Sequence, residues 1–282
     1  LMFAQALIGA IGPVIVFVGG FVGLKLAPSE VLATLPVACM IVGIALFMLP
    51  TVKLLQQVGR KKGFIMAVCW GIANSFFTAY SIYLENFWLF CTCILLYGFL
   101  IAAVQQFRFA AMESVDESKA SQAVSVLLLA GLLAAFLGPE VAFWGRGWFE
   151  TEYMGSFVGV SALLALSLLF ISFYQPTTFT TPDPQQTGRP LTIIAKQPVF
   201  IAAIVSASVG FSVMSFIMTA TPISMHVHHG FDLEDTKWVI QSHIIAMYLP
   251  SFFTGKLIAR FGQHKVLYAG LMAFMLCIFI GF

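Results

Sequence analysis

Residues 2–24 read MFAQALIGAIGPVIVFVGGFVGL, with Gln5 as the single polar side chain and no charge. A helix needs about 20 mostly apolar residues to cross the hydrocarbon core of a bilayer. The run therefore predicts a membrane-spanning helix. Comparable apolar runs follow it along the chain, at 32–52, 63–83, 87–109, 121–144, 154–174, 198–222, 238–258 and 265–282.

The composition of the whole chain favours the same environment. Hydrophobic residues make up 60% of the 282 residues and charged residues 9%, and the mean hydropathy is +0.96. Soluble domains carry roughly a quarter charged residues, so this chain could not cover a water-exposed surface with polar groups. The sequence predicts an all-α bundle of membrane-spanning helices. The net charge of +2 gives no reason to expect nucleic acid as a partner.

The longest polar break divides the nine predicted spans into six and three. It covers residues 175–197 and is rich in Pro, Thr and Gln. We expect a six-helix unit at 1–174, a cytoplasmic central loop at 175–197, and part of a second unit at 198–282.

Lysine and arginine are unevenly divided between the two sides of such a bundle. Cytoplasmic loops carry an excess of these residues, which sets the orientation of the chain. The richer side predicts a cytoplasmic N-terminus, and Trp88, Trp144, Trp148 and Trp238 fall at the other ends of the spans. The richer side would hold Lys53, Arg60, Lys61, Lys62, Arg108, Lys119, Arg189, Lys196, Lys256, Arg260 and Lys265, and the other Lys25, Arg146 and Lys237.

A short basic turn occurs twice. Residues 53–62 read KLLQQVGRKK and residues 256–265 read KLIARFGQHK, so that Gly59 and Gly262 lie 203 positions apart. Duplicated halves are common in transporters, where two related bundles rock about a site between them. A repeat of this length implies a parent of roughly four hundred residues and twelve spans. We expect that three further spans are missing after residue 282.

The repeated turns resemble the signature of the major facilitator superfamily, G-x-L-x-D-R-x-G-R-[RK]. Gln56 and Ala259 occupy the positions of the family's aspartate. The resemblance implies alternating-access transport of a small solute, driven by an ion or proton gradient. We expect a monomer in the lipid bilayer, without a cofactor. A conformational role is implied for the residues of the two turns, Gly59, Arg60, Lys61, Lys62, Gly255, Arg260 and Gly262.

Several short stretches are similar to a bacterial subgroup of this superfamily, some members of which import riboflavin. These are AQAL at 4–7, LATLPV at 32–37, RFAA at 108–111 and MTATP at 218–222. The similarity implies a bacterial inner-membrane protein and offers riboflavin as a lead to the solute.

Polar residues inside the spans are candidates for a solute cavity. Ser208, Ser212, Ser215 and Thr219 recur on one helical face, which predicts either a cavity lining or a tight helix contact. Asn74 predicts either a solute contact or a hydrogen bond between helices, and Gln5 is similar. Gln105 and Arg108 share a face, and Arg108 could either bind solute or extend to the membrane surface. Gln241 completes the set of candidates.

Two ionisable residues are candidates for proton coupling. Glu140 is the acidic residue that lies well inside a predicted span, and buried carboxylates often carry protons. A structural role at the membrane interface is the alternative. His243 is the second candidate, although a histidine near a helix end is often only hydrogen-bonded.

No metal site is expected. The histidines at 226–229 and the acidic residues that follow are read as a solvated loop, and the five cysteines as apolar packing residues. Two other classes of protein remain as alternatives to a transporter: a membrane receptor or sensor, and a membrane-embedded enzyme.

Overall fold

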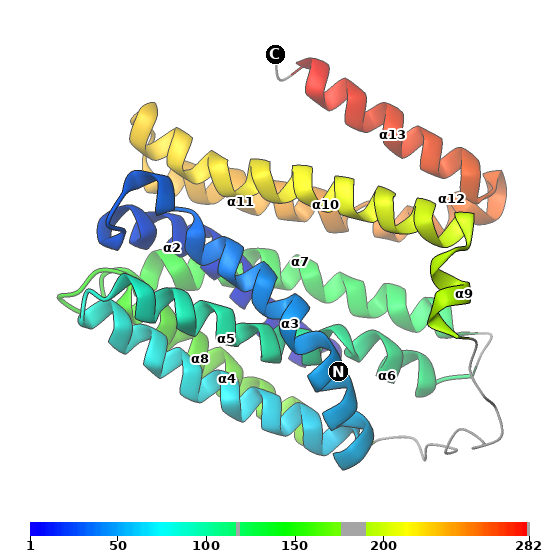
Figure 1. The fold of residues 1–282 in the computed structure, drawn as a ribbon, viewed down its shortest axis with the longest axis horizontal. Coiled ribbons are helices and arrows are strands. Elements are labelled where there is room, and N and C mark those ends of the chain that lie inside the picture. The colour runs from blue at the N-terminus through cyan, green and yellow to red at the C-terminus, as the bar shows by residue number, and fades with distance from the viewer. Residues whose placement is uncertain (117–118, 176–189, 281–282) are drawn as a thin grey trace.

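The computed structural model describes residues 1–116, 119–175 and 190–280, and within them the chain is helical without strands (Figure 1). The predicted all-α class is confirmed. In chain order the helices are α1 (Met2–Gly9), α2 (Ile11–Leu26), η1 (Glu30–Leu32), α3 (Leu35–Val58), α4 (Arg60–Tyr83), α5 (Phe87–Gln105), α6 (Phe107–Glu113), α7 (Ala120–Gly145), α8 (Met154–Ser172), α9 (Leu191–Ala195), α10 (Pro198–Ile223), the π-helical turn η3 (Ser224–His228), α11 (Leu233–Tyr248), α12 (Ser251–Phe261) and α13 (Gln263–Ile280).

Eight helical stretches of the described chain are long and apolar enough to cross a membrane. They correspond to eight of the nine predicted runs. The remaining run, 238–258, is not one helix: α11 ends at Tyr248 and α12 begins at Ser251. Pro250 causes this break, because it lacks the N–H that would continue the helix and its ring clashes with the preceding turn.

The predicted loop at 175–197 also contains a short helix that the sequence analysis missed, α9 at Leu191–Ala195. Most of that loop, including Arg189 of the charge count, lies outside the described residues. The division into six and three spans therefore stays a prediction.

The first eight helices pack closely on one another. Helix α3 lies against α5, α4 lies against α5 and α8, and α1 lies against α7 and α8. Gly43 and Gly98 bring the backbones of α3 and α5 into contact, since a Cβ built on Gly98 would lie 2.1 Å from the carbonyl carbon of Gly43. Small residues at crossings of this kind are typical of membrane helix bundles.

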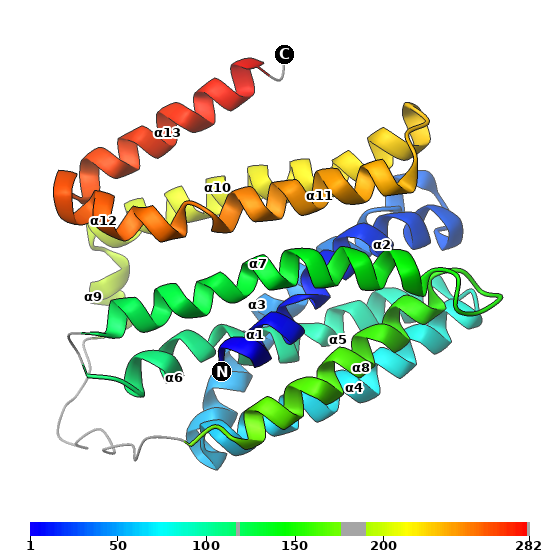
Figure 2. The same ribbon diagram turned by 180° about the vertical axis from the view of Figure 1, so that it is seen from behind.

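The later helices are arranged more loosely. Helices α10 and α11 run side by side and pack on α2 and α7, whereas α13 leads away from the rest of the molecule in both ribbon views (Figures 1 and 2). None of the residues of α13, Gln263–Ile280, is buried. This helix contributes nothing to the packed core of the described chain.

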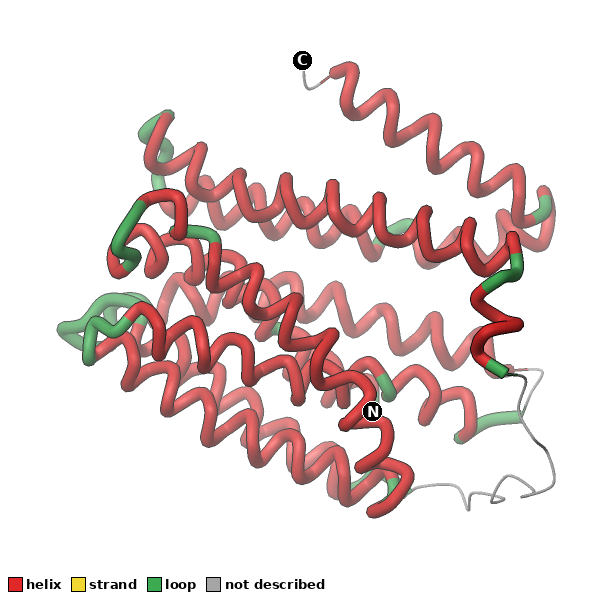
Figure 3. The backbone as a smooth tube through the Cα atoms, in the orientation of Figure 1, coloured by secondary structure: helices red, strands yellow, loops and turns green. Residues whose placement is uncertain are grey.

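The two basic turns have the same backbone geometry. Gly59 adopts φ 84° and ψ 153°, and Gly262 adopts φ 83° and ψ 155°. Glycine takes positive φ without the steric penalty that other residues meet. In Figure 1 the turn between α3 and α4 lies low and right of centre and the turn between α12 and α13 at the right edge (the same view is drawn in Figure 3), and we call the side of the molecule that holds both turns the basic end. The 203-residue repeat is thus present in the backbone as well as in the sequence.

Candidate functional site

A cavity of about 150 Å³ lies between the early helices and the later ones, and we call it the interface cavity. Its polar groups include Ser215 and Thr219 of α10, and Phe211 and Tyr248 contribute aromatic rings. The opposite wall comes from α1, α2, α3 and α7. The full lining is Gly9, Gly12, Pro13, Val16, Val37, Met40, Gly131, Ala134, Phe211, Met214, Ser215, Met218, Thr219, Ile244, Met247 and Tyr248.

A second cavity, of about 220 Å³, lies next to it, and we call it the amide cavity. It brings together three of the predicted residues, Gln5 of α1, Gln105 of α5 and Arg108 of α6. Arg108 donates from Nε to the Gln105 carbonyl at 3.0 Å and from Nη2 to Gln105 Oε1. Apolar residues of α5 and α7 complete the wall, together with Tyr248.

Tyr248 and Gly131 line both cavities and form the wall between them. The Tyr248 ring sits directly on Gly131, where an added Cβ would lie 2.4 Å from ring carbons. Tyr248 is the last residue of α11 before the break at Pro250. Sequence reasoning missed this residue, although the break that positions it was readable from Pro250.

Not all the predicted cavity residues reach a cavity. Ser208 and Ser212 lie on the face that carries Ser215 and Thr219, but neither lines the interface cavity or the amide cavity, and both are exposed. Asn74 is buried, lines neither cavity, and donates from Nδ2 to the Cys93 carbonyl at 2.8 Å. Of its two predicted roles, the hydrogen bond between helices is the one that the geometry favours.

Glu140 forms an ion pair between α7 and α11. Its Oε1 lies 3.0 Å from Lys237 Nζ and accepts a hydrogen bond from Gln241 Nε2 at 3.2 Å, and its Oε2 accepts from Trp144 Nε1 at 2.9 Å. Lys237 is 4% exposed, and its ammonium lies over the Phe143 ring at 4.7 Å from the centroid. A buried lysine is held by this carboxylate and by the aromatic ring.

The predicted span at 238–258 leaves Lys237 outside the helix, and the structure corrects this boundary. Helix α11 begins at Leu233, earlier than predicted, so Lys237 lies one turn inside the helix and faces α7. The spacing of Lys237 and Gln241 by four residues puts them on one helical face. This spacing is the feature of the sequence that could have predicted a shared helical face for Lys237 and Gln241.

His243, the second proton-coupling candidate, is separate from this ion pair. Its Nε2 is buried and has no hydrogen-bond partner among the described residues, and the same holds for Gln241 Oε1 and Gln5 Oε1. These atoms are polar groups that the described chain leaves unsatisfied.

Sequence comparison agrees with the arrangement of the helices. A profile of the Major Facilitator Superfamily matches residues 1–282. The chain belongs to this superfamily. It is therefore a multi-pass membrane protein of a transporter family, and no solved structure matches it.

Three transporters of this superfamily are similar to the chain. The riboflavin transporter RfnT of Brucella anthropi is 37% identical over 276 residues, which cover 96% of this chain and 69% of RfnT. Two uncharacterized MFS-type transporters of Bacillus subtilis, YddS and YdeG, are each 27% identical, over 280 and 273 residues. The matches cover 93% and 88% of this chain, and the chain spans only 64% and 61% of those two proteins.

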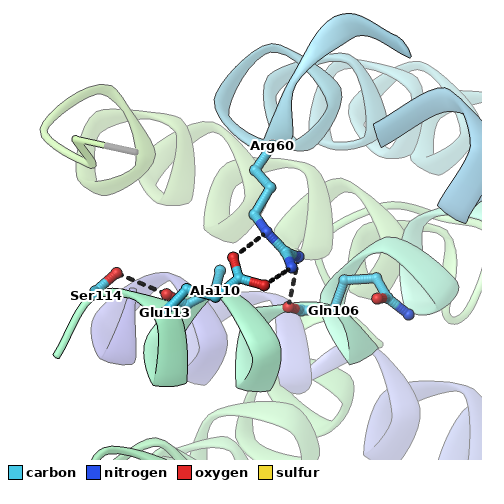
Figure 4. A network of polar contacts seen from close by, with 5 residues as sticks. All are labelled: Arg60, Gln106, Ala110, Glu113 and Ser114. Atoms are coloured by element: carbon cyan, nitrogen blue, oxygen red, sulfur yellow. Dashed lines mark hydrogen bonds and ion pairs between the residues drawn. The ribbon is translucent and has the colours of Figure 1, made fainter. Parts of the chain in front are cut away.

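The superfamily's signature turn at Gly59 is tied to the end of α6 (Figure 4). Arg60 donates to Glu113 through Nε at 2.8 Å and through Nη2 at 2.5 Å, and from Nη1 to the Gln106 carbonyl at 3.4 Å. Lys61 Nζ donates to the Ser172 carbonyl at 2.6 Å. Arg60 and Lys61 therefore connect α4 to α6 and α8, while Lys62 is exposed. Glu113 was not predicted, because its partner lies 53 residues away.

The second turn is less well connected. Arg260 lies over the Phe261 ring at 5.4 Å from the centroid, and Gly255 is exposed on α12. The conformational role of both turns remains a prediction.

Proposed function

We propose that the full-length protein is a secondary transporter that moves riboflavin, or a similar flat and polar solute, across the bacterial inner membrane by alternating access. The interface cavity carries the proposal. It lies where helices from before and after the central loop meet, and it combines aromatic rings with hydroxyl groups. The similarity to RfnT supports the choice of solute.

Alternating access requires contacts that open on one side while others close. At the end remote from the basic turns, the ion pair of Glu140 with Lys237 joins the two sets of helices, and the His226 ring contacts Phe21 at 5.5 Å between centroids. We propose that these contacts form one barrier to the solute. Toward the basic end, the contact of Tyr248 with Gly131 forms the second barrier. We expect the two barriers to open in turn, each giving the solute access from one side of the membrane.

Glu140 is the proposed carrier of the coupling proton. Protonation would remove the negative charge that faces Lys237 and weaken the hold of α7 on α11. His243 is the second candidate, because its buried Nε2 is without a partner in the described chain. We further propose a monomer with a cytoplasmic N-terminus and the basic end toward the cytoplasm.

The test of the proposed function is uptake and efflux of labelled riboflavin in cells that express the full-length protein and lack other riboflavin transport. We expect gradient-driven movement that a protonophore abolishes. Riboflavin movement equal to that of cells with empty vector would overturn the proposed solute. Movement that the protonophore leaves unchanged would overturn proton coupling but not transport.

The role of Glu140 is tested with Glu140→Gln. The variant should lose gradient-driven uptake but retain riboflavin exchange between two equal pools, since exchange needs no net proton movement. Glu152→Gln is the matched control, because Glu152 pairs with Arg146 at 2.9 Å on the surface of the molecule. Unchanged gradient-driven uptake in Glu140→Gln would exclude Glu140 as the carrier.

A further inference from the structure

We propose that the amide cavity recognises the imide edge of a flat heteroaromatic ring, the edge that presents a carbonyl, an N–H and a second carbonyl in a row. The isoalloxazine ring of riboflavin has such an edge. The inference rests on the proposed function for the class of solute. It adds the hydrogen bonds by which this chain would recognise the imide edge of that solute.

Gln5 supplies the acceptor for the N–H of this edge. Gln5 is one of the residues that line the amide cavity, and its Oε1 is buried without a partner among the described residues. A buried acceptor without a donor is unfavourable, and a ligand that donates a hydrogen bond there removes the penalty. Helix α1 holds Gln5 in place, because its neighbours Ala4 and Ala6 are buried against the rest of the bundle.

Arg108 and Gln105 supply donors for the two carbonyls. The contacts of Arg108 described above use its Nε and Nη2, and they fix the guanidinium against Gln105. Nη1 of Arg108 and Nε2 of Gln105 have no protein partner in the described part of the chain. The two side chains lie three residues apart at the junction of α5 and α6, beside the cavity that also contains Gln5. The acceptor can pair with the N–H of the imide edge, and the donors near it can pair with the two carbonyls.

The rest of the amide cavity suits a flat apolar ring. Val104, Leu127 and Leu128 line it, and the Tyr248 ring forms the wall that it shares with the interface cavity. A dry cavity of about 150 Å³ holds a single benzene ring. A cavity of about 220 Å³ therefore has room for the imide ring, and the remaining rings would extend past Tyr248 into the interface cavity when the contact of Tyr248 with Gly131 opens.

The experiment compares riboflavin with 3-methylriboflavin, in which a methyl group replaces the hydrogen of the imide N–H. Binding to the purified full-length protein is measured by quenching of flavin fluorescence. We expect the wild-type protein to bind riboflavin about ten- to a hundredfold more tightly than the methylated analogue, since a site built to accept a hydrogen bond rejects a ligand that cannot donate it. Gln5→Leu should weaken riboflavin binding by a similar factor and leave the affinity for 3-methylriboflavin unchanged.

Two further variants control the result. Gln56→Leu changes the same residue type at an exposed position of α3, and it should leave the ratio of the two affinities unchanged. Arg108→Gln, also at an exposed position, should weaken both ligands alike, because both retain the carbonyls. Unchanged affinity for 3-methylriboflavin in Gln5→Leu would show that this variant is folded.

Equal affinity of the wild-type protein for the two flavins, or a preference that persists in Gln5→Leu, would overturn the inference while leaving riboflavin transport in place. If riboflavin does not bind, the proposed solute is wrong, and lumichrome and thymine then serve as imide-bearing probes. Binding of either probe that Gln5→Leu lowers at least tenfold would support the site without the proposed solute. Failure of all three ligands to bind would overturn both.

Discussion

One span from before the central loop and one from after it are similarly apolar but unequally packed within the described chain. The most apolar stretch of Met2–Leu26 has a mean hydropathy of 2.3 and that of Pro198–His228 has 2.1. Within the described chain, which spans 61–69% of the length of the relatives it matches, 72% of the first stretch is buried and none of the second. Hydropathy therefore predicts that a helix enters the membrane, but it does not tell whether its surface meets protein or lipid.

The largest difference in stability between variants of the two regions is expected when a glycine is replaced by alanine. Gly98→Ala should destabilise the protein by about 3 kcal/mol or more, because the new methyl group would meet the backbone of α3, which cannot move without separating the helices. Gly270→Ala in α13 should be neutral or slightly stabilising, since no described atom lies within 4 Å of an added Cβ. Thermal unfolding of the detergent-solubilised protein measures both. Equal shifts in Tm would contradict the contrast.

The second-largest effect on stability is expected when the ion pair that joins the two regions is broken. Glu140→Ala should lower stability by about 3 kcal/mol, because it leaves the ammonium of Lys237 buried without its carboxylate. Glu152→Ala, which breaks only surface pairs with Lys25 and Arg146, should lower it by less than about 1 kcal/mol.

A double replacement sharpens the comparison. Glu140→Met with Lys237→Met should recover most of the lost Tm, since two apolar side chains need no partner. A double variant as unstable as Glu140→Ala would show that the loss did not arise from the unpaired lysine.

The contact between Tyr248 and Gly131 should have a smaller effect. Gly131→Ala should lower stability by about 1–2 kcal/mol, because the obstacle is a side chain that can shift rather than a backbone. Gly12→Ala is the control, as it lines the interface cavity with no described atom within 4 Å of the added Cβ. Combining Gly131→Ala with Tyr248→Ala should remove the penalty of the first change. Additive losses of Tm would mean that the two residues do not meet.

The smallest effect is expected at the basic turns. Arg60→Lys should lower stability by about 1 kcal/mol or less, because lysine cannot make the two-pronged contact of Arg60 with Glu113. Arg260→Lys should change Tm less still, since among the described residues Arg260 contacts the Phe261 ring and has no ion pair. A larger loss of Tm in Arg260→Lys than in Arg60→Lys would contradict the expectation that the first turn is the better connected of the two.

Much of the fold could be predicted from the sequence, because it follows from local properties. Apolar length identified eight spans, and the 203-residue repeat identified two glycines that both need positive φ. The face shared by Gln105 and Arg108 follows from helical period alone, and the structure places it in one cavity with Gln5.

The remainder of the site depends on how distant helices pack. Ser208 and Ser215 share a face, yet period alone cannot tell how far along α10 the opposite wall of the interface cavity extends. Lys237 and Tyr248 acquire their partners only because α11 lies against α7. These contacts join residues about a hundred positions apart, which no local pattern specifies.

Protection from a thiol reagent measures whether a solute occupies the interface cavity, between the two regions of the molecule. Ser215→Cys and Ser208→Cys are introduced singly into the full-length protein, with the exposed Cys69 and Cys277 replaced by serine. Riboflavin should slow the modification of Ser215→Cys by a methanethiosulfonate at least severalfold and leave Ser208→Cys unaffected. Protection of both cysteines, or of neither, would contradict binding of riboflavin in the interface cavity.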